Sequence, residues 1–295
     1  MAHETKAADS TDRRTAWRAI GLFLFLTLIF TCVFGGLMGY QGATPRILVT
    51  GVMWSPGAAA LATCLILKRP IATLHWRWGN WKWIGLAWAL PVGYGLLIYA
   101  PVWLLHLGGS DFPNTATLID WNRQLLGAET TNPITATAFV LMLATLGVIS
   151  SASRALGEEI GWRGFFIWEL RKVMPFWAVG LFSGCVWAVW HWPAILFTDY
   201  NAGEGSFVLQ MFFFTMAIVP QGIVYAYFTF KSASLWPAVV LHASHNLFIQ
   251  QVFTPLTVRG EGTHRYIDEF GIVMPTLGVF LALYFYYRAR KDGIA

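Results

Sequence analysis

Eight stretches of about 20 mostly apolar residues follow one another along the chain. A helix of about this length crosses the hydrocarbon core of a bilayer and satisfies its own backbone hydrogen bonds there. The composition agrees, because only 12% of the residues are charged, whereas a soluble domain averages about 25%. We therefore predict an all-α, polytopic membrane protein with about eight transmembrane helices, over 17–39, 47–67, 83–105, 134–153, 175–197, 207–230, 234–254 and 270–288.

The Lys and Arg residues fall mainly on one set of connecting segments. If the N-terminus is cytoplasmic, the inside segments and their flanks hold 16 of the 20 cations, as the positive-inside rule requires. This predicts both termini in the cytoplasm, with a tail over 1–16, a membrane domain over 17–288 and a second tail over 289–295. In a bacterial host the expected location is the plasma (inner) membrane.

The same distribution bears on partners. The basic residues behind the net charge of +5 are spread over the ends of apolar runs. They therefore indicate membrane topology, and no nucleic-acid partner is expected. Membrane lipids are the partners that the composition implies, and no pattern in the sequence specifies an oligomeric state. The outside segment 107–132 is expected to contain one short helix around Asp120 to Arg123.

A cluster of ionisable residues interrupts this apolar background. Glu158 and Glu159 are adjacent, Arg163 follows four residues after Glu159, and His191 and His242 lie farther along the chain. Charged groups at membrane depth are costly unless they are paired or line a wet cavity, so they mark a candidate functional site.

Helical spacing assigns different roles to the two glutamates. Neighbouring helical residues point about 100° apart, and Glu159 stands four residues before Arg163, the favourable order for an ion pair. Glu158 is left without a local partner, as a general base would be. His242 and Asn246 are four residues apart and share one helix face, as do Trp187 and His191.

The depth of these groups can be compared along the helix axes. Glu158 lies about 21 Å before Lys172, and His191 about 26 Å after Met174, at 1.5 Å per residue. Two antiparallel helices would therefore bring them to similar heights. This requires a helix of nearly 40 residues, or a break near Gly157 or Gly161.

Each element also has a simpler explanation. A Glu with an Arg four residues later is often only an ion pair, and a single membrane histidine is often structural. His245, three residues after His242, is expected to be structural or to support the site. A non-enzymatic immunity or scaffold protein that keeps the cluster for binding is one alternative. A proton-coupled transporter is another, although no repeated half is visible.

Motif comparison narrows the chemistry. The sequence contains no H-E-x-x-H, and Gly180 to Gly184 lacks a G-x-S-G. The ordered set Glu158-Glu159-x-x-x-Arg163, Trp187-x-x-x-His191 and His242-x-x-x-Asn246 resembles the CAAX protease and bacteriocin-processing family, also called the Abi family. The resemblance covers roughly 135–250, with Trp187 where many members have Phe.

The resemblance implies an eight-helix intramembrane endopeptidase acting on a membrane-associated or lipidated protein or peptide. It further implies that Glu158 and His191 activate a water, that His242 and Asn246 stabilise the oxyanion, and that Glu159, Arg163 and Trp187 support them. The family has been described both as glutamate-dependent and as metal-dependent. No cofactor is therefore specified, and the zinc alternative would use Glu158, His191 and His242.

Overall fold

The computed structural model describes residues 10–110, 112, 115–127 and 132–295. Within these ranges the regular structure is helical apart from one isolated bridge between Gly109 and Val258. Six helices are long and apolar enough to cross a membrane. The protein is thus an all-α, polytopic membrane protein, as predicted. The six are α1 (Ser10–Gln41), α2 (Arg46–Ile66), α3 (Trp81–Leu104), the run Pro133–Arg171, α8 (Phe176–Phe197) and α9 (Phe207–Ser232).

The two other predicted spans are also helical. The seventh consists of α10 (Trp236–His245) followed by a π-helical segment, η4 (Asn246–Phe253), and the eighth is α11 (Val273–Lys291). The short helix expected in the 107–132 segment is α4 (Ala116–Leu126), which begins at a Thr115 cap and ends at left-handed Gly127. The remaining short elements are the 3-10 turns η1 (Ile71–Thr73) and η5 (Thr263–Arg265).

The fourth helix does not end at 153 as predicted. It continues without a break as α5 (Pro133–Met142), η2 (Leu143–Gly147), α6 (Val148–Glu159), η3 (Ile160–Phe166) and α7 (Ile167–Arg171), 39 residues in all. The predicted inside segment 154–174 is therefore mostly helix, and Arg154 and Arg163 are not loop cations. The predicted boundary was based on apolarity alone. The helix can continue past it because Glu158, Glu159 and Arg163 are buried in the interior of the protein.

Glycines allow α2 to lie very close to this long helix. A Cβ added to Gly157 would lie 2.6 Å from Trp54, and one added to Gly161 would lie 2.5 Å from Pro56. Gly57 on α2 makes the reciprocal approach, because its added Cβ would lie 2.5 Å from the carbonyl oxygen of Gly157. These glycines do not break the helix. They hold α2 against the segment that carries Glu158 and Glu159.

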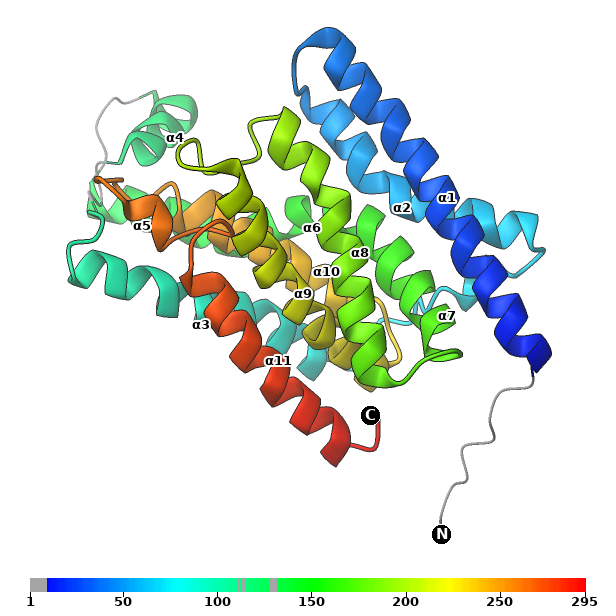
Figure 1. The fold of residues 1–295 in the computed structure, drawn as a ribbon. Helices are drawn as coiled ribbons and strands as arrows, with labels where there is room; N and C mark the ends of the chain where they lie inside the picture. The colour runs from blue at the N-terminus through cyan, green and yellow to red at the C-terminus, as the bar shows by residue number, and fades with distance from the viewer. Residues whose placement is uncertain (1–9, 111, 113–114, 128–131) are drawn as a thin grey trace.

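The ends of the described chain meet at one end of the bundle. Arg13 donates to the carbonyl of Val173, and Arg171 donates to the carbonyl of Ile294. Both contacts involve the turn between α7 and α8, and Figure 1 shows α1 starting and α11 ending on that side. An even number of spans requires this arrangement. Which side of the membrane this end faces stays a prediction.

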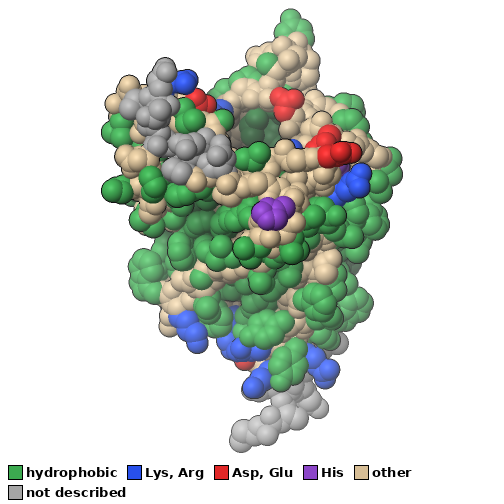
Figure 2. Space-filling view, turned by 90° about the vertical axis from the view of Figure 1, so that its left-hand side faces the viewer, with side chains coloured by type: hydrophobic (Ala, Val, Ile, Leu, Met, Phe, Trp, Pro, Cys, Tyr) green, Lys and Arg blue, Asp and Glu red, His purple; other side chains and the backbone are tan. Residues whose placement is uncertain are grey.

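The surface has the banding expected of a membrane protein. Figure 2 shows hydrophobic side chains across the middle of the molecule and Lys and Arg side chains gathered at its lower end. Large apolar side chains are exposed on the outer helices, among them Leu97, Leu146, Phe197 and Phe280. Such a surface is stable against lipid, and in water it would be an aggregation hazard.

Candidate active site

The four residues predicted to carry chemistry line one cavity of about 390 Å³. Glu158 comes from α6, His191 from α8, His242 from the end of α10, and Asn246 from the start of η4. Three helical runs distant in sequence thus bring these side chains together, as the expected similarity of height requires. The amides of Gln250 and Gln251 and the ring of Tyr200 also line the cavity.

One wall of the cavity is apolar. It is formed by the end of α1 and the first half of α2, with Met38, Val49, Val52 and Met53 facing the space. The polar lining groups come from other elements, α6, α8 and the α10–η4 run. A molecule in this cavity would meet both hydrocarbon and hydrogen-bonding groups.

Glu158 is almost completely buried, with 1% of its surface exposed. Its Oε2 accepts a 2.8 Å hydrogen bond from Nε1 of Trp187, which lies on α8. The sequence predicted no partner for Glu158 on its own helix. Its partner, Trp187, comes from another helix and is brought to it by the tertiary structure. Across the described part of the chain no other side chain is hydrogen-bonded to Glu158, so Oε1 is left for a molecule in the cavity.

Glu159 faces away from Glu158 and joins two helices. Its Oε1 accepts a 2.8 Å bond from Arg163, the predicted ion pair, and a second 2.8 Å bond from Nδ1 of His242. The second contact was not foreseen, because spacing along one helix says nothing about a partner 83 residues away. Glu159 therefore orients His242 as well as compensating Arg163.

Arg163 is buried between two aromatic rings. Its guanidinium carbon lies 4.2 Å from the ring centroid of Trp187 and 4.0 Å from that of Tyr225. A cation over aromatic faces is stabilised by the ring quadrupoles, which together with Glu159 offsets the cost of burying the charge. Trp187 thus contacts Arg163 with its face and Glu158 with its N–H.

The two histidines are held in defined tautomers by their hydrogen bonds. Nδ1 of His191 donates to the carbonyl of Trp187 over 2.8 Å, and Nδ1 of His242 donates to Glu159. In each ring this leaves Nε2 as the nitrogen available to the cavity. An unprotonated Nε2 accepts a proton, whereas a protonated one donates a hydrogen bond.

Two of the three motif-bearing helical runs change pitch at the site. The π-helical segment η3 starts directly after Glu159, and η4 starts at Asn246. Such segments inside α-helices are frequent at functional sites, since the extra residue per turn re-aims neighbouring side chains. Here they flank the acidic pair and the His/Asn pair.

A second buried network, missed by the sequence analysis, adjoins the cavity. Glu269 accepts hydrogen bonds from His245 (2.8 Å), Gln250 (2.8 Å) and Tyr200 (2.9 Å), and His245 also bonds Tyr94. Glu269 is only 2% exposed, so these protein donors take the place of water in stabilising its buried carboxylate. His245 is thus part of a supporting network. An acidic pair, Asp268-Glu269, directly before an apolar run was the one signal that could have found it.

The network also ties down Tyr200, which packs beside His191 with ring centroids 6.1 Å apart. Tyr200 lies between α8 and α9, where burial and the neighbouring Glu269 raise the pKa of its hydroxyl well above 10. The phenol therefore stays protonated and donates to Glu269.

The zinc alternative would require Glu158, His191 and His242 to be arranged as metal ligands. Among the described residues, no group of three or more His, Cys, Asp or Glu side chains is placed so that it could hold a metal ion. Glu158, His191 and His242 nevertheless line the same cavity, and their hydrogen bonds to Trp187 and Glu159 use only Oε2 of Glu158 and Nδ1 of each histidine. The zinc alternative stays a prediction.

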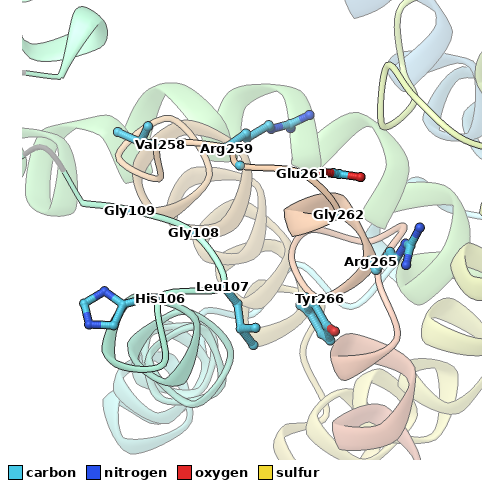
Figure 3. Close-up of a pocket in the computed structure, with 11 residues that line it drawn as sticks. His106, Leu107, Gly108, Gly109, Val258, Arg259, Glu261, Gly262, Arg265 and Tyr266 are labelled. Carbon is cyan, nitrogen blue, oxygen red and sulfur yellow. The ribbon is translucent and has the colours of Figure 1, made fainter.

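Another cavity, of about 480 Å³, contains none of the predicted residues. It is lined by residues of the glycine-rich segments 106–109 and 258–266. Figure 3 shows the charged ends of Arg259, Glu261 and Arg265 extending to one side and the ring of His106 pointing away on the other. No cluster of catalytic groups faces this space.

The fold and the site together define a class: a polytopic helical membrane protein with a glutamate, two histidines and an asparagine around one intramembrane cavity. Residues 133–248 match a family model described as type II CAAX prenyl endopeptidase, Rce1-like. This range contains all seven residues of the predicted motifs. The resemblance to CAAX-type membrane proteases is thereby confirmed for the motif-bearing segment.

A curated relative points the same way. The chain is 29% identical over 94 residues to a protein named CAAX prenyl protease 2 from Methanococcus maripaludis. The similarity covers 30% of this chain and 34% of the relative. The chain thus spans about a third of the length of the curated relative it matches.

Proposed function

We propose that the protein is an intramembrane endopeptidase that hydrolyses a peptide bond of a lipidated, CAAX-like protein or peptide. The observation that carries this proposal is the convergence of Glu158, His191, His242 and Asn246 on one cavity. The similarity of residues 133–248 to CAAX-type proteases supports the reaction class. The apolar wall from α1 and α2 supports a substrate with a hydrocarbon group.

In the proposed reaction a water lies between Glu158 and the peptide carbonyl. Oε1 of Glu158 takes a proton from this water, and Nε2 of His191 accepts a hydrogen bond that fixes its orientation. The water oxygen then bonds to the carbonyl carbon. The proton on Glu158 passes to the leaving nitrogen as the C–N bond breaks, which leaves a new carboxylate and a new amine.

The negative charge that develops on the carbonyl oxygen needs donors. Asn246 offers an amide N–H, and His242 offers Nε2–H when the ring is doubly protonated. Glu159 favours this charged ring, because its carboxylate lies 2.8 Å from Nδ1. Donors held in place in a water-poor site are worth a few kcal/mol to such a transition state.

Glu158→Gln tests the assignment. The amide cannot accept the proton, so we expect cleavage to fall at least about 10²-fold while the protein still folds. The assay uses the protein in proteoliposomes with an S-prenylated peptide ending in a C-a-a-X sequence, with product measured by mass spectrometry. Glu261→Gln, which removes a carboxylate outside the cavity, is the matched control and should cleave like the wild type.

Two further results would decide between functions. Wild-type protein that binds the peptide without cutting it would favour the non-enzymatic alternative. A chelator arm measures metal dependence in the same assay, and loss of activity restored by zinc would overturn the metal-free reaction. If the Glu158→Gln protein cleaves the peptide at the wild-type rate, Glu158 is not the general base.

A further inference from the structure

Arg154 occupies an unexpected place for a cation in this protein. Sequence hydropathy puts it just past the end of a span, but in the structure it lies inside the run Pro133–Arg171. Arg171 is 17 residues farther on, about 26 Å along the axis. Arginines inside membrane-crossing helices face the bundle interior or a wet cavity, and they mark binding groups more often than topology.

Arg154 has no partner for its charge in the part of the chain that the structure describes. Among the described residues it has no hydrogen bond or ion pair, whereas the other cation of this helix near the site, Arg163, is paired with Glu159. Glu158 lies four residues after Arg154, but the order cation then acid is the less favourable one. Glu158 instead accepts its hydrogen bond from Trp187.

Arg154 lines the same cavity as Glu158, His191 and Asn246. It is partly buried, and its position on the helix is four residues, about 6 Å of axial rise, from that of Glu158. An extended peptide covers this distance with about two residues. The amide of Gln251 lies on the same cavity and can bind a peptide backbone.

We propose that Arg154 is a specificity residue of this site: its guanidinium binds a carboxylate of the substrate a few residues from the bond that is cut. The inference rests on the proposed hydrolysis at Glu158 for the position of that bond. Guanidinium binds carboxylate with two parallel N–H bonds, a geometry that lysine cannot reproduce. The carboxylate can be the end of the substrate chain or an acidic side chain.

The test compares three S-prenylated peptides of one sequence: a free C-terminal acid, a C-terminal amide, and an amide with Asp as its last residue. Preference for the free acid alone assigns the subsite to the chain end, and preference for both acidic peptides assigns it to any carboxylate. In the wild type we expect kcat/KM for an acidic peptide to exceed that for the neutral amide by about ten- to hundredfold, since hydrogen bonds to charged groups are strong. Equal cleavage of all three peptides would overturn the proposal.

Variants then locate the effect. Arg154→Gln should bring the acid-to-amide ratio close to one, mainly through KM, and Arg154→Lys should restore only part of it. Arg290→Gln removes an exposed cation at the far end of α11 and should keep the wild-type ratio. If Arg154→Gln slows cleavage of acid and amide peptides equally, Arg154 is not a carboxylate subsite.

A binding measurement separates this proposal from the hydrolysis itself. Peptide affinity is measured with Glu158→Gln protein, with and without Arg154→Gln, so that no cleavage is needed. Weaker binding of the acidic peptide on loss of Arg154 supports the subsite even if the wild type cuts nothing. Affinity for acid and amide that is equal in both proteins overturns it.

Discussion

At the scale of single residues, Trp187 does more than fill space beside His191. Its N–H is hydrogen-bonded to Glu158, its ring face covers Arg163, and its carbonyl accepts from His191. One side chain and its backbone thus connect three members of the site. The spacing to His191 predicted a shared helix face, and the tertiary contacts add the hydrogen bond that orients Glu158.

Trp187→Phe removes this hydrogen bond and keeps an aromatic ring. We expect kcat to fall by about ten- to hundredfold, because a bond to a charged group contributes about 1.5–3 kcal/mol. KM should change little, since Trp187 does not line the cavity. Steady-state kinetics on a prenylated peptide measures both.

Trp192→Phe is the matched control on the same helix. Its Nε1 donates to Thr215 and not to the site. If both variants lose the same activity, orientation of Glu158 by Trp187 is refuted.

At the scale of elements, the contact between α2 and the long helix determines where the acidic pair lies. Gly157 and Gly161 flank Glu158 and Glu159 in sequence, and both face α2 at distances that no side chain would allow. The same device joins α8 to α9, where a Cβ on Gly222 would lie 2.1 Å from the carbonyl of Gly180. Close backbone approach through small residues is how membrane helices gain packing without a hydrophobic driving force.

Gly161→Ala should destabilise the protein. The added Cβ would meet Cβ and the backbone of Pro56 at 2.5–2.6 Å, so α2 and the long helix would have to move apart. We expect a loss of about 1–3 kcal/mol in the free energy of unfolding, as for other overpacked interiors. Thermal unfolding in detergent gives the measurement.

Gly85→Ala is the comparison, because nothing lies within 4 Å of its added Cβ on α3. There the substitution should stabilise slightly, by up to about 1 kcal/mol, through better helix propensity. A Gly161→Ala protein as stable as Gly85→Ala would show that the α2 contact is not close.

At the scale of the whole molecule, the Glu269 network joins parts of the chain that no local rule connects. Glu269 lies between η4 and α11 and is hydrogen-bonded to His245 on α10, Gln250 on η4 and Tyr200 in the α8–α9 loop. His245 extends the network to Tyr94 on α3. Burial and the charge of Glu269 raise the pKa of neighbouring Asp268 from 3.8 to about 7, which Arg259 at 4.0 Å only partly offsets. The hydrogen bonds to Glu269 lower the pKa of that group.

These shifts predict a pH dependence of stability. Between about pH 4 and pH 7 the folded protein keeps a proton on Asp268 that the unfolded chain has released, so stability falls as pH rises through this window. The lowered pKa of Glu269 changes the stability only below its ordinary pKa of 4.5, which is outside the range of pH 5–8. We therefore expect the Tm of the wild type to fall by several degrees from pH 5 to pH 8, relative to Asp268→Asn.

Asn is a suitable replacement because Asp268 adopts a left-handed backbone with φ of 66°, which Asn tolerates. The two proteins are compared by thermal unfolding at each pH. Parallel pH profiles would contradict the assignment to Asp268.

The sequence by itself determined the class of fold and most of the candidate residues. Apolar runs of membrane length permit only helices, and ionisable groups among them are too costly to be incidental, so both signals are local and can be read residue by residue. The spacing of Glu159 and Arg163 predicted their ion pair because that signal is also local. A helix of nearly 40 residues was one of two geometries the spacing allowed.

Only the tertiary structure decided which helices meet, and therefore which partners the polar groups have. Trp187 for Glu158, His242 for Glu159, and Tyr200 for Glu269 are pairs separated by 29, 83 and 69 residues. Arg154 changed from a topology signal to a cavity residue because the helix continues past 153. Helix periodicity fixes the direction of each side chain relative to its own axis, whereas the rotation and contact of whole helices depend on packing that no local pattern encodes.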